Sequence, residues 1–174
     1  MKYLVISDIH GGVLGAGLIS SLSDNVDKIL ILGDILYHGP RNDLPEDYAP
    51  KSVISILNPL KDKIIAIKGN CEAEVDQMVL DFKIEDYVDM DINGYNAHLE
   101  HGHHIDLYHG NANLILQGHT HIPVLEKIND VIYLNPGSIT LPKGGNPKTY
   151  AIIDENMIFL YDFSQKLIKK LKIN

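Results

Sequence analysis

Seven side chains of the sequence have the chemistry of metal ligands, and they fall in five short segments that each follow an apolar run. They are Asp8, His10, Asp34, Asn70, His101, His119 and His121. Their carboxylate, imidazole and amide groups suit Mn²⁺, Fe, Zn²⁺, Ni²⁺ or Co²⁺, and the lack of thiolates argues against a structural zinc site. Such a set exceeds the needs of one ion but suits two ions about 3.5 to 4 Å apart that share a carboxylate. Asp34 is the natural bridge.

Each segment also has an ordinary structural interpretation. Asp and His are common in turns and helix caps, and Gly69-Asn70 is typical of a turn. Two histidines separated by one residue in a strand often only share a face. These independent explanations do not account for all five segments together, so the joint pattern favours a metal site.

The elements that must position these side chains are strands followed by turns. Apolar runs rich in β-branched residues predict buried strands at residues 2–7, 28–33, 63–69 and 113–118. Helix-compatible spacing follows each of the first three strands, at VLGAGLISSLSD, KSVISILNPL and EAEVDQMVLDF, which predicts a mainly parallel sheet. The later half looks strand-dominated and predicts a second sheet, with KLIKKLKIN as either a helix or an edge strand. Because open α/β sheets bind ligands at the carboxyl ends of their strands, the five segments should converge.

Length and composition limit the class of protein. The 174 residues suit a single domain, 1–174, and 45% hydrophobic residues supply a substantial core. A formal net charge of −8 disfavours a nucleic-acid polymer or an anionic membrane surface as partner. No stretch approaches the roughly 20 apolar residues of a membrane span, and the lone Cys71 forms no internal disulfide, so we expect a cytoplasmic protein. The sequence does not determine the oligomeric state, and a homo-oligomer is one of the alternatives.

The segment GGVLGAG offers a competing interpretation as a dinucleotide-binding turn, with Asp34 about 20 residues on as the ribose ligand. However, Gly12, Gly15 and Gly17 reverse the G-x-G-x-x-G spacing. This interpretation also leaves the later histidines unexplained, and we set it aside.

The motifs together resemble those of the calcineurin-like metallophosphoesterases. The matching segments read SDIHG, LGDILYHGPRND, KGNCEAEVDQM, EHGHH and QGHTHIP, followed by NPGSITLPKGGNPKTYAIID. LYHGPRN, GNC and NPGS with PKGGNP look particularly like the small YfcE-type phosphodiesterases. The resemblance implies a four-layer αββα sandwich of two mixed sheets flanked by helices. It also implies one metal held by Asp8, His10, Asp34 and His121, and a second held by Asp34, Asn70, His101 and His119.

The function implied is that of a metal-dependent phosphodiesterase that hydrolyses small phosphodiesters through a metal-bridging hydroxide. The expected cofactors are two divalent ions, with Mn²⁺ favoured, and the catalytic residues are Asp34, Asn70 and His101. A phosphomonoesterase and a non-catalytic scaffold module on the same fold are the alternatives. A scaffold need not keep the whole ligand set, whereas this sequence keeps every position.

Three further residues are expected at the substrate. His38 and Arg41 lie in the loop after Asp34, where they would contact the phosphate or the leaving group. Cys71 follows Asn70 where many relatives carry a histidine thought to protonate the leaving group, and its other interpretation is a buried small residue.

Overall fold

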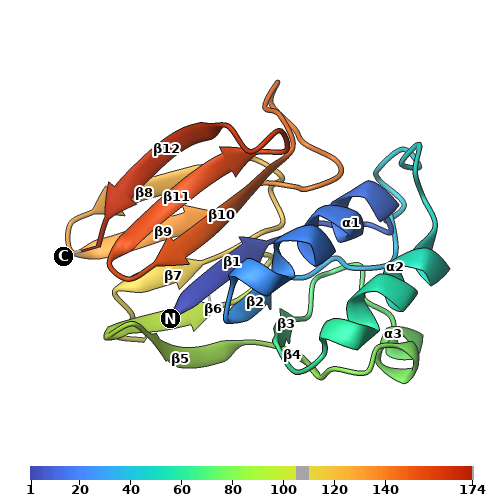
Figure 1. The fold of residues 1–174 in the computed structure, drawn as a ribbon, viewed down its shortest axis with the longest axis horizontal. Coiled ribbons are helices and arrows are strands. Elements are labelled where there is room, and N and C mark those ends of the chain that lie inside the picture. The colour runs from blue at the N-terminus through green and yellow to red at the C-terminus, as the bar shows by residue number, and fades with distance from the viewer. Residues whose placement is uncertain (105–109, 174) are drawn as a thin grey trace.

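Two β-sheets face each other in the computed structural model, which describes residues 1–104 and 110–173 (Figure 1). The larger sheet has the strand order β12-β11-β10-β1-β2-β3-β4. Its strands are β1 (Lys2–Ile6), β2 (Lys28–Ile31), β3 (Ile64–Ile67), β4 (Ile84–Glu85), β10 (Thr149–Asp154), β11 (Met157–Asp162) and β12 (Leu167–Lys172). Strands β1 to β4 are parallel, and β10 pairs with β1 in the antiparallel sense, so this sheet is mixed. The C-terminal segment is therefore an edge strand, one of its two predicted forms.

The smaller sheet has the order β5-β6-β7-β9-β8. Its strands are β5 (Val88–Ile92), β6 (Tyr95–Leu99), β7 (Leu114–Leu116), β8 (Val124–Ile128) and β9 (Val131–Asn135). The pairs β6–β7 and β7–β9 are parallel and the outer pairs are antiparallel, so this sheet is also mixed. The strand-dominated second half predicted from the sequence is confirmed.

The helices fall between the first strands, where the sequence predicts them. Within residues 1–104 and 110–173 they are α1 (Val13–Leu22), α2 (Pro50–Leu57) and α3 (Glu74–Val79), with 3₁₀ turns η1 (Ser23–Asn25) and η2 (Asn58–Leu60). Together with the two mixed sheets, they confirm the predicted fold class. Among the residues that the structure describes, no helix is long and apolar enough to span a membrane.

The central strands are buried on both faces, and successive residues serve two different cores. Leu4 and Ile6 of β1 pack in a cluster with Ala16 and Ile19 of α1. Tyr3 and Val5, on the opposite face of the strand, pack in a second cluster with residues of the five-stranded sheet. Near-continuous apolar strands are typical of a sheet covered on both sides. This burial fixes the positions of the loops that follow β1, β2 and β3.

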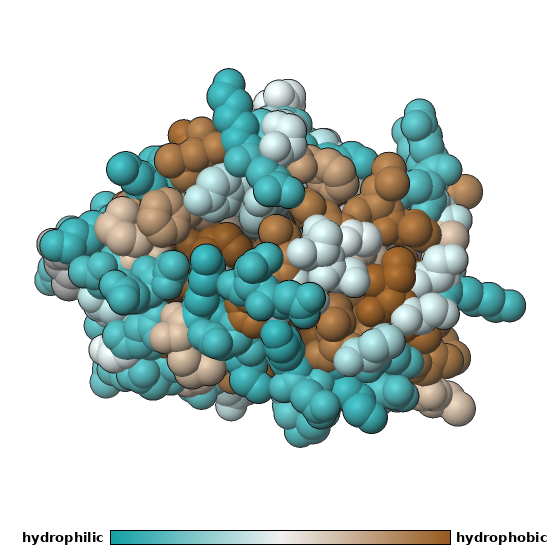
Figure 2. All heavy atoms as spheres, viewed as in Figure 1, coloured by the Kyte–Doolittle hydropathy of each residue, from teal (hydrophilic) through white to brown (hydrophobic). Residues whose placement is uncertain are grey.

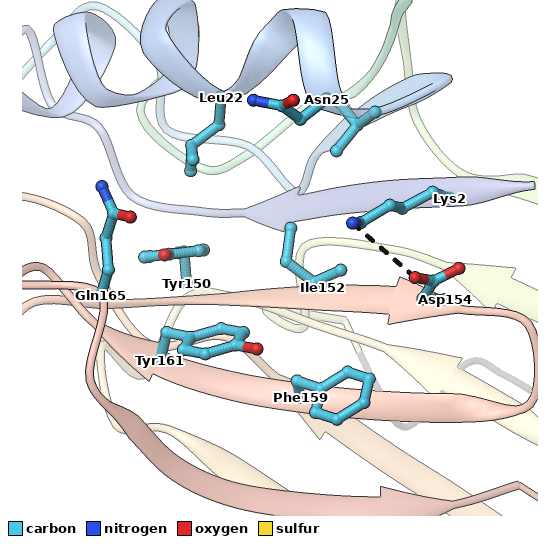
Figure 3. Close-up of a pocket in the computed structure, with 10 residues that line it drawn as sticks. Lys2, Leu22, Asn25, Tyr150, Ile152, Asp154, Phe159, Tyr161 and Gln165 are labelled. Atoms are coloured by element: carbon cyan, nitrogen blue, oxygen red, sulfur yellow. Dashed lines mark ion pairs between the residues drawn. The ribbon is translucent and has the colours of Figure 1, made fainter.

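A hollow of about 350 Å³ lies between the end of α1 and the outer face of β10 and β11 (Figure 3). The rings of Tyr150 and Tyr161 stack there with centroids 5.5 Å apart. Lys2 Nζ lies 3.7 Å from Asp154 Oδ2 at its edge. Hydrophobic side chains gather over these strands and beside α1 on the same face (Figure 2). Because Lys2 begins β1 and Asp8 follows its other end, this hollow is separate from the predicted metal site.

Candidate metal centre

The predicted ligands follow the carboxyl ends of strands from both sheets. Asp8, Asp34 and Asn70 come after β1, β2 and β3, which are parallel neighbours, so their loops meet at one edge of the larger sheet. His101 and His119 come after β6 and β7, which are parallel neighbours in the smaller sheet. The predicted convergence of distant segments is present in the structure.

The backbone at these positions is unusual. Among the described residues, nine that are not glycine have positive φ, and five of them are predicted ligands. These five are Asp8, His10, Asp34, His119 and His121, with φ between 47° and 67°. The left-handed region is unfavourable for a residue with a Cβ, and it persists where the surrounding structure requires it, often at functional sites. The remaining four include Asn93 and Asn129, which lie in the turns between strands where such φ values are common.

The first group of side chains consists of Asp8, His10 and His121. His121 Nε2 lies 3.2 Å from Asp8 Oδ1 and 3.2 Å from His10 Nε2, and His10 Nε2 lies 3.6 Å from Asp8 Oδ1. All three residues are buried, and Asp8 Oδ1 has no hydrogen-bond partner within the described part of the chain. Two imidazole nitrogens beside an unpartnered carboxylate oxygen form an arrangement that a cation would complete.

Asp34 connects this group to a second one. Its Oδ2 lies 3.6 Å from His10 Nε2 and 3.4 Å from His101 Nε2. His101 Nε2 in turn lies 3.2 Å from Asn70 Oδ1, and the rings of His101 and His119 have centroids 5.1 Å apart. The carboxylate of Asp34 therefore occupies the intermediate position that a bridging ligand requires.

Backbone carbonyl groups fix the orientation of three imidazoles through their Nδ1 atoms. His10 Nδ1 lies 2.8 Å from the carbonyl oxygen of Tyr37, and His101 Nδ1 lies 2.6 Å from that of Leu32. His121 Nδ1 lies 2.5 Å from the carbonyl oxygen of Leu141. Because a carbonyl only accepts hydrogen bonds, each Nδ1 carries a proton, and each neutral ring then turns the lone pair of Nε2 toward the carboxylates. This is the tautomer that a metal-ligating histidine needs.

The electrostatics of the buried cluster favour positive charge. Burial alone would raise the pKa of Asp8, but its close contacts with His10 and His121 and the charge of His101 hold the pKa well below its usual range. Burial alone would lower the pKa of His101, but its contact with Asp34 and the charge of Asp8 raise it to about 9. A lowered pKa for a buried carboxyl beside a raised pKa for an imidazole shows that this cluster favours positive charge.

Two glycines let the backbone approach the carboxylates closely. A Cβ at Gly69 would lie 2.1 Å from Asp34 Oδ1, and one at Gly118 would lie 1.9 Å from Ser7 Oγ and 3.0 Å from Asp8 Oδ2. A side chain at Gly69 would therefore overlap the predicted ligand Asp34, and one at Gly118 would overlap Ser7 and crowd Asp8. The glycines in the KGNC and QGHTH segments are thus explained by packing against the site.

Two of the three residues predicted to contact substrate line a cavity at the site, and the third does not. Arg41 and Cys71 line a small cavity of about 30 Å³ together with Asp34, Asn70, His119 and His121. His38 is not among its lining residues, and its ring packs edge-on against Tyr37 and Tyr48, with centroids 4.7 and 5.3 Å away. Lys143, which the sequence analysis did not single out, also lines this cavity. Arg41 and Lys143 thus add two cationic side chains to its lining.

Glu72 is the most informative residue that the sequence analysis missed. Its Oε2 accepts hydrogen bonds from the backbone N–H groups of Asp34, at 3.0 Å, and of Gly69. Its Oε1 accepts the N–H of Ile35 at 2.5 Å. One carboxylate therefore connects the loop after β2 to the loop after β3, and each of these loops carries a predicted ligand. The only sequence signal was its position directly after Asn70-Cys71.

The NPGS segment supports the other side of the cluster. Ser138 Oγ donates to the carbonyl oxygen of Asp8 at 2.7 Å and accepts the backbone N–H of Leu141 at 2.8 Å. Leu141 is the residue whose carbonyl holds His121. Ser138 therefore links the backbone positions of Asp8 and His121, two members of the first group.

The fold and this arrangement of ligands define a class of hydrolase, and comparison with known proteins agrees. The model of the calcineurin-like phosphoesterase superfamily domain matches residues 1–157, and the chain belongs to this family. The phosphodiesterase YfcE of Escherichia coli (strain K12) is 39% identical over 182 residues, with 100% of this chain and 99% of the relative covered. The phosphodiesterase MJ0936 of Methanocaldococcus jannaschii is 29% identical over 168 residues, which cover 88% of this chain and 93% of that one.

A solved structure of YfcE, described as a phosphoesterase from E. coli, superposes with a TM-score of 0.94. The superposition covers 100% of both chains, at 39% sequence identity. The predicted family, including its YfcE-type subfamily, is confirmed, and so is the predicted fold class. The predicted functional class, a phosphoesterase, is that of the family.

Proposed function

We propose that the protein is a divalent-metal-dependent phosphodiesterase that hydrolyses small phosphodiesters. One observation carries the proposal: three imidazoles, each fixed through Nδ1 by a carbonyl, direct Nε2 at the carboxylates of Asp8 and Asp34. The first metal ion would be held by Asp8, His10, Asp34 and His121. The second would be held by Asp34, Asn70, His101 and His119.

The donor set fits two ions of intermediate hardness, and we propose Mn²⁺ as the activating metal. Such ions, when bound, polarise phosphoryl oxygens and lower the pKa of a bound water enough to give hydroxide near neutral pH. The chain itself orients the ligands. Tyr37, Leu32 and Leu141 supply the carbonyl groups that fix the rings, and Glu72 fixes the backbone of Asp34.

The substrate phosphate would lie against the cavity that Arg41 and Lys143 flank. Two cations there attract an anionic ester and favour the phosphoryl group over neutral molecules. The amide of Asn70, beside His101, adds a dipole at the same place. In hydrolysis, the oxygen of water forms the new bond to phosphorus, the bond to the leaving oxygen breaks, and that oxygen takes up a proton.

Preference for a diester over a monoester is supported by the relatives and by Cys71. Burial, together with the charge of Asp34, raises the pKa of the Cys71 thiol to about 12, which makes it a poor proton donor to a leaving alkoxide. A phosphodiester with a good leaving group needs that proton least. The net charge of −8 opposes binding of a long nucleic acid, so the proposed substrate is small.

We also propose that residues 1–174 form one domain and that the protein acts in the cytoplasm. Strands β11 and β12 extend the sheet that contains β1, which supports a single domain beyond the matched residues 1–157. The lone cysteine fits a reducing compartment. Retention of all seven predicted ligands at one location favours an enzyme over a scaffold on the same fold.

The direct test compares hydrolysis of bis(4-nitrophenyl) phosphate and 4-nitrophenyl phosphate by the purified protein reconstituted with Mn²⁺. The two substrates release the same alcohol, so the ratio of their kcat/KM values reports the preference for a diester. We expect the diester to be hydrolysed at least tenfold more efficiently. A preference for the monoester would replace the proposal with a phosphomonoesterase, and no hydrolysis of either ester would favour the scaffold.

A further inference from the structure

A second cleft of about 420 Å³ opens beside the proposed metal centre. The start of α1 and the loops before α2 and β10 form its walls. Leu14 comes from the helix, Leu44 from the first loop and Leu141 from the second. Its volume lies within the range of small-molecule sites, about 300 to 1,000 Å³.

The cleft and the metal cavity share both of their loops. Asn42 lines the metal cavity and Leu44 lines the cleft, while on the opposite wall Lys143 lines the cavity and Leu141 lines the cleft. Residues two apart in the chain are separated by at most about 7 Å. The two hollows are therefore immediate neighbours, and the carbonyl of Leu141 also holds the imidazole of His121 at 2.5 Å.

The lining of the cleft is mixed: it contains the apolar residues Leu14, Leu44, Pro45 and Leu141 and the polar residues Glu46, Asp47, Thr140 and Lys148. Leu14 is 57% exposed and Leu44 is 59% exposed, although both are large hydrophobic residues. The nearby Asp47 is already engaged, since its Oδ2 accepts the backbone N–H of Leu14 at 2.7 Å. Lys148 lies over the ring of Phe163, 5.7 Å from its centroid. Exposed apolar side chains gathered around one cleft mark a binding site for an apolar group.

We propose that this cleft binds an apolar ester substituent of a phosphodiester whose phosphate lies at the metal centre. The inference rests on the proposed function, and it narrows the substrate class to singly charged diesters that carry an alkyl or aryl group. Arg41 and Lys143 would lie at the phosphate, while Leu14, Leu44 and Leu141 would contact the substituent. Because the same two loops line both hollows, we assign the cleft to the substrate instead of to a separate ligand.

Binding of two stable diester analogues tests the proposal without catalysis. Methyl methylphosphonate and methyl hexylphosphonate have the same charge and differ by five methylene groups on a P–C bond that is not hydrolysed. Calorimetric titration into the Mn²⁺-reconstituted protein should show at least tenfold tighter binding of the hexyl compound, because burying methylene groups is favourable. Equal affinities, or no binding of either compound, would overturn the proposal.

Two variants locate the preference. The double variant Leu14→Ser, Leu44→Ser should reduce the ratio of the two dissociation constants to about one. Leu167→Ser removes a leucine that is 43% exposed on β12 and should keep the wild-type ratio. A preference that survives in the double variant would overturn the assignment of the cleft. If the double variant instead changed its molecular mass in light scattering while the ratio of dissociation constants stayed at the wild-type value, the assignment would also be overturned. The two leucines would then belong to a contact between two copies of the chain.

Hydrolysis and the hexyl preference together distinguish failure of the cleft assignment from failure of the proposed phosphodiesterase activity. Hydrolysis of bis(4-nitrophenyl) phosphate without a preference for the hexyl compound would reject the cleft and keep the phosphodiesterase. A hexyl preference in a protein that hydrolyses no phosphate ester would reject the phosphodiesterase and keep the cleft as an apolar binding site.

Discussion

The carboxylate of Glu72 accepts the backbone N–H of Asp34 at 3.0 Å, so the proposed bridging ligand is fixed by a residue 38 positions further along the chain. The same oxygen accepts the N–H of Gly69, next to Asn70. Glu72 contacts no reacting atom in the proposed mechanism and acts through the ligands that it positions.

Glu72→Gln should weaken the site because an amide offers one acceptor oxygen where the carboxylate supplies two. We expect a loss of roughly 1 to 3 kcal/mol in the free energy of unfolding and weaker Mn²⁺ binding. Glu126→Gln, at an exposed position on β8, is the matched control and should change neither quantity. Denaturant unfolding and calorimetric metal titration measure both. Wild-type metal affinity in a folded Glu72→Gln protein would show that Glu72 does not position the ligands.

Asp34→Asn should be the most damaging single substitution for activity. Asp34 lies between His10 and His101, so its loss would weaken the binding of both proposed metal ions. Substituting a residue that only hydrogen-bonds to a metal ligand lowers metal affinity or activity by about 10- to 100-fold. Loss of the bridging ligand itself should therefore lower kcat/KM by more than about 100-fold. Asp154→Asn, at the exposed ion pair with Lys2, controls for the loss of a charge.

His98→Ala is a control substitution at a histidine that is not among the predicted metal ligands. His98 is buried and lies 2.7 Å from Asp89 on β5, away from the predicted ligands. The variant should therefore lose stability, while kcat/KM per folded molecule stays within about twofold. Equal losses of activity in Asp34→Asn and His98→Ala would contradict the assignment of the ligands.

Cys71→His should raise activity on esters with poor leaving groups. A thiol whose pKa is raised to about 12 gives up its proton less readily than an imidazolium, and a positioned general acid contributes about 10²–10⁴-fold. Measuring kcat/KM over a series of esters of graded leaving-group pKa should give a shallower dependence for the variant. The metal content of both proteins must match, because the thiol lies 3.3 Å from the amide nitrogen of Asn70. An unchanged slope would show that position 71 does not face the leaving oxygen and that Cys71 is a packing residue.

Gly118→Ala should disturb the first metal group by steric overlap, since its Cβ would lie 1.9 Å from Ser7 Oγ. We expect destabilisation of about 1 to 3 kcal/mol, as for overpacking in a core, and a weaker first metal site. Gly17→Ala in α1 meets nothing within 4 Å and should instead stabilise the protein by about 0.5 to 1 kcal/mol. Thermal unfolding of both variants, with and without Mn²⁺, measures the difference. Equal shifts would mean that the close approach at Gly118 is not required.

The sequence predicted the fold and the convergence of the ligands because both depend on local patterns. A buried strand is a short apolar run, and the polar residue after it is adjacent in the chain, as Asp8 is to β1. The roles of Glu72 and Lys143 had no such pattern. Glu72 binds backbone N–H groups from two separate loops, and backbone groups carry no sequence signal. Lys143 reaches the cavity through a loop whose path depends on Ser138 and Leu141.

We propose that hydrolysis depends on two metal ions bound by this cluster. The most direct measurement is a titration of metal-free protein, verified by elemental analysis, with Mn²⁺ while bound metal and the rate of diester hydrolysis are recorded together. We predict no hydrolysis without metal, a rate that rises as the sites fill, and saturation at two ions per chain. Hydrolysis at an undiminished rate by the verified metal-free protein would contradict the account.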